Sequence, residues 1–246
     1  MISGLCSAWL GVGGSLFIVP FLPFLSGLSA FTSLQVSLLL IVTISFINSA
    51  SFALQKLILW DRLIKASLLA LSFAFLSGAL VSHLSSLQIR FILWLFLAVI
   101  LSLPWLLTHK PVLKKRKGFY LFSSLMGVCS GLTGLGGGMI LSPFLHESES
   151  LPVRNIPALV SCIMLFVSVF SLLGQLSQTD LFFMGSSDGL FIYFLLLFPA
   201  FAGLLMGYFI NVKQKNIKLR KFLLRIAVAV IFLKMTIELF VQSELF

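Results

Sequence analysis

The sequence is poor in charged residues, and this scarcity is the first guide to its class. Only 10% of its 246 residues are Asp, Glu, Lys or Arg, whereas a soluble domain usually has about a quarter. Hydrophobic residues make up 59% of the chain, and its mean hydropathy is +1.13. A small soluble fold cannot bury this many Leu and Phe side chains. The composition therefore excludes an ordinary soluble protein and predicts a polytopic membrane protein.

Cysteines are also scarce, and the motifs of several enzyme classes are missing. The three cysteines, Cys6, Cys129 and Cys162, all lie inside apolar segments. Without a CxxC pair or a Cys/His cluster, the sequence supports neither a disulfide framework nor a zinc site. It also lacks the GxxxxGK[ST] motif of ATP-driven pumps and the HExxH motif of zinc-dependent hydrolases. We therefore expect no cofactor, no ATP-driven pumping and no enzyme activity.

Acidic residues are outnumbered by basic ones, 7 to 17, which gives a formal net charge of +10. The basic residues gather in short connections between apolar runs, with one cluster in residues 110–117 and another in residues 213–221. Cytoplasmic loops of membrane proteins have this pattern, whereas a nucleic-acid-binding protein carries its basic residues on a soluble module. We expect the lipid bilayer as a partner and no nucleic acid.

The most informative feature that is present is a glycine-rich apolar motif that occurs twice. Residues 4–22 read GLCSAWLGVGGSLFIVPFL and residues 127–145 read GVCSGLTGLGGGMILSPFL, with nine of nineteen positions identical at an offset of 123 residues. Paired glycine-interrupted segments indicate the binding site of a transporter that is built from two repeats. We therefore divide the chain into a first membrane repeat, 1–110, and a second, 111–246.

Eight apolar segments, of about 20 residues each, are candidates for membrane crossings. They are residues 2–25, 31–54, 63–82, 89–107, 118–145, 152–174, 189–210 and 222–241. If all eight crossed, the two basic loops would lie on opposite sides of the membrane, against the positive-inside rule. The conflict disappears if 2–25 and 118–145 are re-entrant hairpins, because each half then crosses three times.

The predicted fold class follows from this assignment. We expect an all-α polytopic membrane protein with two inverted-topology repeats, each with a broken or re-entrant Gly-rich hairpin plus three transmembrane helices. Both chain ends and the loop with Asp180 and Asp188 would then lie outside. The alternative is eight full crossings with one basic loop on the unexpected side.

The glycine clusters also predict where a ligand binds. A glycine cluster breaks a helix, and the half-helix that follows begins with free N–H groups that favour an anion. The predicted substrate-binding residues come from the two clusters and from polar positions inside the spans. They are Gly13, Gly14, Ser15, Gly136, Gly137, Gly138, Ser37, Asn48 and Ser161. The alternatives are close helix packing for the glycines and interhelical hydrogen bonding for the polar residues.

The paired segments at 11–14 and 134–138, each followed by a proline, resemble those of the sulfite exporter TauE/SafE family of membrane permeases. Residues 34–38 and 158–162 resemble the family's Ala-x-x-Thr-Ser-Leu region, with valine in place of threonine. Ser15 departs from the family's third glycine. The resemblance implies a small anionic substrate, an organosulfur or sulfur oxyanion such as sulfite or a sulfonate, that is usually exported across the bacterial inner membrane.

The sequence leaves the mechanism and the assembly open. Glu238 is the only acidic residue well inside a span, so a proton relay is poorly supplied, and we expect uncoupled export by alternating access. Proton coupling through Glu238 or His83 is the second mechanism. The alternative function is that of an accessory or scaffold subunit of a larger membrane complex, and a homo-oligomer is compatible with the sequence.

Overall fold

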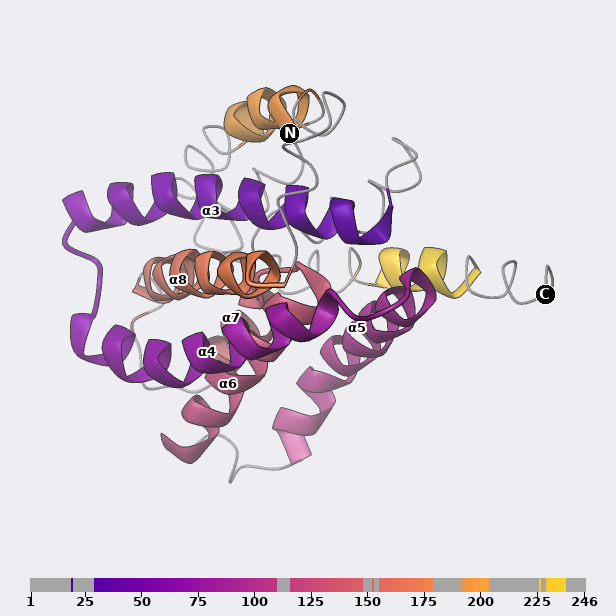
Figure 1. Ribbon diagram of the computed structural model, residues 1–246. Helices are drawn as coiled ribbons and strands as arrows, with labels where there is room; N and C mark the ends of the chain where they lie inside the picture. Colours follow the sequence, from indigo (N-terminus) through magenta and orange to yellow (C-terminus); the bar gives the residue numbers. More distant parts are fainter. Residues whose placement is uncertain are drawn as a thin grey trace.

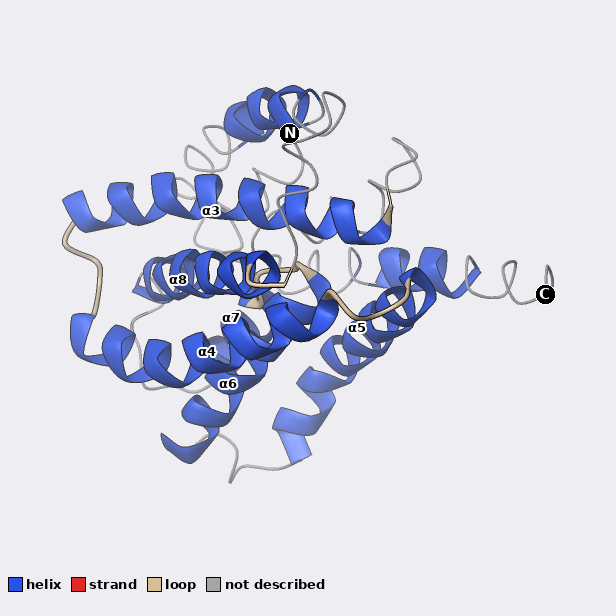
Figure 2. Cartoon of the chain, in the orientation of Figure 1, coloured by secondary structure: helices blue, strands red, loops and turns tan. Residues whose placement is uncertain are grey.

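The computed structural model describes most of the middle of the chain. The described residues are Val19, 29–109, 116–147, Pro152, 155–178, Phe191, 193–203, Ile226 and 229–237. Within them the regular elements are helices, which confirms the predicted all-α class (Figure 2). The labelled helices are α3 (Ala30–Leu54), α4 (Trp60–Val81), α5 (Ser86–His109), α6 (Arg116–Thr133), α7 (Gly138–Glu147) and α8 (Ile156–Leu176). Gly13, Gly14 and Ser15 lie outside the described residues.

Three helices in this part of the chain, α3, α4 and α8, are long and apolar enough to cross a membrane. Their bounds agree with the predicted segments 31–54, 63–82 and 152–174. The segment 118–145, for which a broken or re-entrant hairpin is predicted, divides into two helices, α6 and α7. Because α7 has ten residues, it is about 15 Å long, half the thickness of the hydrocarbon layer. It is therefore too short to cross a membrane by itself.

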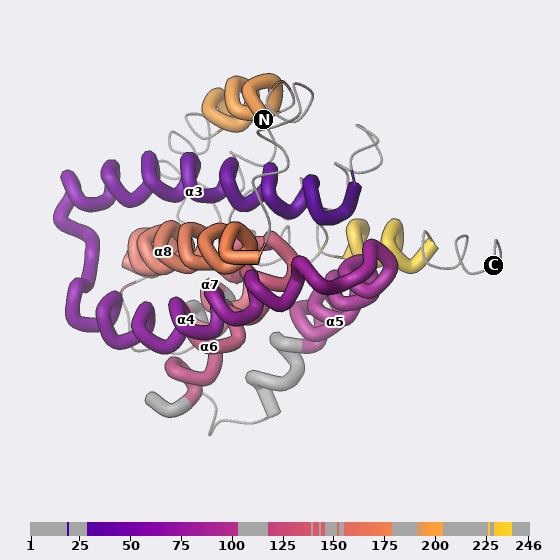
Figure 3. Tube along the Cα trace, viewed as in Figure 1, coloured from indigo at the N-terminus to yellow at the C-terminus, as the bar shows by residue number. Residues whose placement is uncertain are grey.

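Helices from the two halves of the chain interleave. The chain turns back between α3 and α4 (Figure 3), and α8 packs between these two helices (Figure 1). Asn155, at the start of α8, donates a hydrogen bond of 3.0 Å from Nδ2 to the carbonyl of Leu57, just after the end of α3. Because α3 and α8 pack along each other, α3 and α8 therefore run in opposite directions.

Small residues let α4 pack closely against α6 and α8. A Cβ at Gly127 would collide with the carbonyl of Ala70, and one at Gly174 would collide with the carbonyl of Phe75. Ser77 adds a hydrogen bond of 3.4 Å from its hydroxyl to the Gly127 carbonyl. Glycines outside the two glycine clusters thus serve close helix packing. Close packing is also the alternative role given above for the glycines of the clusters.

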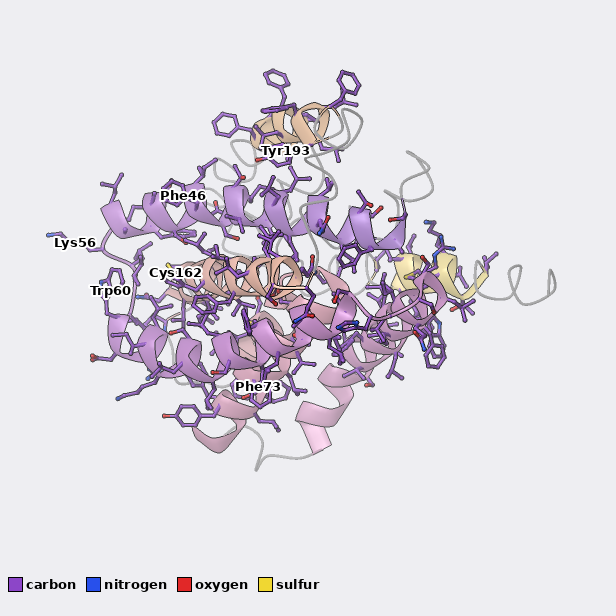
Figure 4. The ribbon with its side chains drawn as sticks, viewed as in Figure 1. Phe46, Lys56, Trp60, Phe73, Cys162 and Tyr193 are labelled. Carbon is purple, nitrogen blue, oxygen red and sulfur yellow. The ribbon has the colours of Figure 1, made fainter. Side chains whose placement is uncertain are left out.

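The outer surface of the bundle is apolar. Phe46 on α3 and Phe73 on α4 lie on opposite outer faces (Figure 4), and both are exposed. Other exposed large apolar side chains on α4, α5 and residues 191–201 include Leu68, Leu76, Leu80, Phe91, Leu95, Phe194, Leu195 and Phe198. An apolar exterior on this scale suits contact with lipid chains rather than with water.

A lysine ends α3 in a conformation that normally belongs to glycine. The N–H of Leu57 donates to the Phe52 carbonyl at 3.1 Å and that of Lys56 to the Ala53 carbonyl at 3.0 Å. This is a Schellman turn, and Lys56 has a φ of +54°. A residue with a side chain pays about 1–2 kcal/mol for this left-handed conformation, so Lys56 strains the turn.

Replacing Lys56 with glycine should therefore stabilise the protein. We expect Lys56→Gly to raise the free energy of unfolding by about 1 kcal/mol, measured as a higher Tm in detergent. Lys65 is a matched control, because it is an exposed lysine with ordinary helical backbone within α4. Lys65→Gly should lower stability by about 1 kcal/mol. An equal loss of stability in both variants would contradict the strain at Lys56.

Candidate functional site

The second copy of the glycine motif forms a helical hairpin. Gly137, just before α7, lies against Met126 of α6. Farther from the turn, the ring of Phe144 on α7 stacks on that of Phe122 on α6, with 4.5 Å between the ring centroids. The contacting residues are farther apart in sequence the farther they lie from the turn. α7 therefore runs back along α6. Residues 134–137 form the tip of this α6–α7 hairpin.

The tip needs its glycines for conformation and for space. Gly134, Gly136 and Gly137 have φ angles of +64°, +68° and +64°, in the left-handed region that side chains disfavour. A Cβ at Gly136 would also lie 2.8 Å from Met164 Cε and 3.2 Å from Ile41 Cγ2. The positive φ angles of the glycine cluster therefore end α6, as predicted for a glycine cluster. The missing side chains also let α3 and α8 approach the tip closely.

The tip is buried near the middle of two membrane-length helices. Residues 134–138 are all buried, and Gly136 faces Ile41 and Met164, which lie near the midpoints of α3 and α8. The hydroxyl of Ser37 donates to the carbonyl of Gly134 at 3.2 Å and to that of Leu34 at 2.8 Å. Irregular backbone at this depth is tolerated because protein covers it.

The N-terminus of α7 has free hydrogen-bond donors. Two backbone N–H groups at the tip have acceptors within the protein. The N–H of Gly134 donates to the Ser130 carbonyl at 2.9 Å, and that of Ile140 donates to the Gly137 carbonyl at 3.0 Å. In the described part of the chain, nothing accepts from the N–H groups of Gly136, Gly137 or Gly138. These donors begin a helix whose dipole is positive at this end, so they are suited to bind an anion.

The structure brings several of the predicted site residues together. Gly136, Gly137 and Gly138 lie at the hairpin tip, and Ser37 is anchored to it. Ser161 is buried on α8, one turn before Met164 and on the same face. Asn48 is buried on α3 but lies two turns beyond Ile41, about 10 Å along the helix. Ligand binding by these residues stays a prediction.

The sequence analysis missed several buried hydroxyl groups beside the hairpin. Ser171 of α8 donates from its hydroxyl to that of Ser130 on α6, at 3.1 Å. Thr133 donates to the carbonyl of Cys129 at 2.6 Å and accepts from the N–H of Leu135 at 3.4 Å. The sequence does contain a signal for the hydroxyls of α8. The spacing of Ser161, Ser168 and Ser171 places them on one face of an apolar helix.

A comparison with protein families gives a match over nearly the whole chain. A family model described as sulfite exporter TauE/SafE matches residues 1–235 of the 246. The chain belongs to the sulfite exporter TauE/SafE family. This TauE/SafE chain is therefore a multi-pass membrane protein from a family of sulfur-anion transporters. The match confirms the resemblance seen in the glycine motifs. Neither the curated proteins nor the solved structures contain a significant match to it.

Proposed function

We propose that this TauE/SafE protein exports a small sulfur oxyanion, such as sulfite or a sulfonate, and binds it at the tip of the α6–α7 hairpin. The observation that carries the proposal is the buried N-terminus of α7, where the N–H groups of Gly136, Gly137 and Gly138 have no acceptor in the described ranges. Buried donors of this kind are costly unless they are satisfied, and an oxyanion offers several acceptors at once.

Alternating access needs two halves that can exchange roles, and we propose that 1–110 and 111–246 are inverted repeats. The opposite directions of α3 and α8 support this, because these helices occupy equivalent places in the two halves. In the proposed arrangement the first glycine motif forms a second hairpin. It would add Gly13, Gly14 and Ser15 to the same site from the opposite side of the membrane.

The charged residues support one orientation in the membrane. Lys56, Arg62 and Lys65 lie at the end of the bundle where α4 begins. α6 begins with Arg116 at the same end, because Gly127 lies beside Ala70 and Gly131 beside Ala74, farther along both helices. We propose that this end faces the cytoplasm and that the α6–α7 hairpin enters the membrane from it and returns to it.

Cysteine labelling tests this orientation. Lys56 and Ser85 are both exposed and lie at opposite ends of α4. In intact cells we expect a membrane-impermeant maleimide to label Ser85→Cys but not Lys56→Cys, and to label Lys56→Cys once the cells are permeabilised. The unmodified chain reports any labelling of the native cysteines. Labelling of Lys56→Cys from outside would reject the proposed orientation.

Reconstitution tests the function itself. We expect liposomes that contain the purified protein to release preloaded sulfite or methanesulfonate at least tenfold faster than protein-free liposomes, because the protein removes the cost of moving an ion through lipid. The release should saturate with substrate concentration. A scaffold subunit would give no release above the protein-free rate for either compound, and that result would overturn the proposal.

A further inference from the structure

The turn that joins α3 to α4 carries a compact group of exposed charges. Lys56 lies in this turn, and Asp61, Arg62 and Lys65 follow in the first two turns of α4; all four are exposed. Three positive charges against one negative charge leave this corner of the bundle net positive. In the described part of the chain, the ammonium groups of Lys56 and Lys65 have no hydrogen-bond or ion-pair partner. Their charge is therefore available to a partner outside the protein.

The strain at Lys56 brings no contact inside the described part of the protein. Its φ of +54° belongs to the region that glycine adopts at lower cost, and its side chain projects away from the bundle (Figure 4). A costly backbone conformation persists at sites where function needs the residue that adopts it. The strain at this exposed lysine therefore indicates that its ammonium group has a ligand.

The ammonium group of Lys65 is directed toward the same end of the bundle. Lys65 lies five residues after the start of α4, about 8 Å along the helix axis. Helical side chains lean toward the N-terminus of their helix, and long lysine side chains in membrane helices extend toward the polar boundary. Both effects bring the charge of Lys65 toward the turn that contains Lys56.

An apolar stripe begins beside these charges. Trp60, the first residue of α4, is exposed at the same corner as Lys56 (Figure 4). Ile64 and Leu68 follow Trp60 at intervals of four residues and are also exposed, so the three side chains lie on one face of α4. Tryptophan is enriched at the boundary between lipid headgroups and acyl chains. Along α4, ammonium groups, an indole and aliphatic side chains therefore follow in the order of the parts of a phospholipid.

We propose that this corner of the bundle binds an anionic phospholipid, such as phosphatidylglycerol. The phosphate contacts the ammonium groups of Lys56 and Lys65, the indole of Trp60 lies at the level of the glycerol, and an acyl chain covers the stripe of Ile64 and Leu68. Charge complementarity selects an anionic lipid, because the choline of phosphatidylcholine already neutralises the phosphate beside it. The inference is independent of the substrate and of the direction of transport.

Lipid binding to the purified protein in an uncharged detergent tests the chemistry of the ligand. We expect phosphatidylglycerol, labelled on an acyl chain, to bind about tenfold more tightly than labelled phosphatidylcholine. The difference should shrink in concentrated salt, which screens exposed charges. Glycerol phosphate, which has the phosphate but no acyl chains, should compete weakly. Equal binding of the two phospholipids, or competition by glycerol phosphate as strong as by phosphatidylglycerol, would overturn the proposal.

Substitutions test the two lysines. A lysine near an anionic lipid surface contributes about 1 kcal/mol, which corresponds to about a fivefold change in Kd. We therefore expect Lys56→Gln and Lys65→Gln each to raise the Kd for phosphatidylglycerol about fivefold. Asp61→Asn should lower this Kd, because it removes the opposing charge. Arg90→Gln is the matched control. It removes one positive charge near the start of α5, at the other end of α4, and it should leave the Kd unchanged.

Lys56→Gly separates lipid binding from stability. It removes both the strain and the ammonium group, so it should raise the Tm without lipid and weaken phosphatidylglycerol binding about fivefold. If the lysines serve only to orient the chain during membrane insertion, both glutamine variants will bind phosphatidylglycerol like the unmodified protein, and that result would overturn the proposal. An equal loss of binding in Arg90→Gln would reveal a general effect of net charge and would also overturn it.

Discussion

Replacing Gly137 with valine is expected to abolish transport. Gly137 has a φ of +64°, and a Cβ there would collide with the carbonyl of Met126. Because that obstacle is backbone, α7 must move away from α6 to make room, and β-branched side chains resist the left-handed conformation. The free N–H groups of the tip would then leave their positions. We expect flux to fall at least a hundredfold, the loss typical when positioned donors are removed.

A matched variant distinguishes loss of the site from general damage. Gly127→Val meets a comparable obstacle, the carbonyl of Ala70, but Gly127 lies two turns before the tip. Both variants should lower the Tm and the yield. Per folded molecule, measured after size-exclusion chromatography, Gly127→Val should retain flux and Gly137→Val should have none. Normal flux in folded Gly137→Val would place the anion site elsewhere in the protein.

Membrane potential is expected to drive the substrate out of the cell without help from protons. A monovalent anion gains about 2.3 kcal/mol for each 100 mV of inside-negative potential, which corresponds to roughly a fiftyfold concentration ratio at equilibrium. In liposomes with a potassium gradient and valinomycin, the final outside-to-inside ratio of methanesulfonate should therefore rise about fiftyfold at −100 mV. The measurement is the distribution of labelled methanesulfonate at steady state.

Proton coupling predicts a different result from the same liposomes. In that case the ratio would follow a pH gradient imposed at zero potential, and substitution of the relay residue would remove the effect. His83 is exposed in the turn between α4 and α5, at one end of the bundle, and Glu238 lies outside the described residues. We expect Glu238→Gln to leave the voltage response unchanged. A ratio that depends on pH and not on voltage would reject uncoupled export.

The sequence alone determined the class of the protein, most helix bounds and the place where the second motif breaks. These features depend on local properties. A run of about 20 apolar residues forms a helix in lipid wherever it occurs, and a cluster of glycines weakens a helix through backbone entropy. The break at 134–137 and the start of α7 at Gly138 therefore follow from the residues that form them.

Only the tertiary structure decided what surrounds the hairpin tip. The small polar residues of α3 are spread around the helix among apolar ones, and buried residues surround its whole first half. Its sequence therefore has no single polar face that could indicate its neighbours. The insertion of α8 between α3 and α4, the bond from Ser171 to Ser130, and the contact of Met164 with Gly136 all depend on which helix faces meet. Close packing between distant segments fixes those faces, and single segments of sequence do not record it.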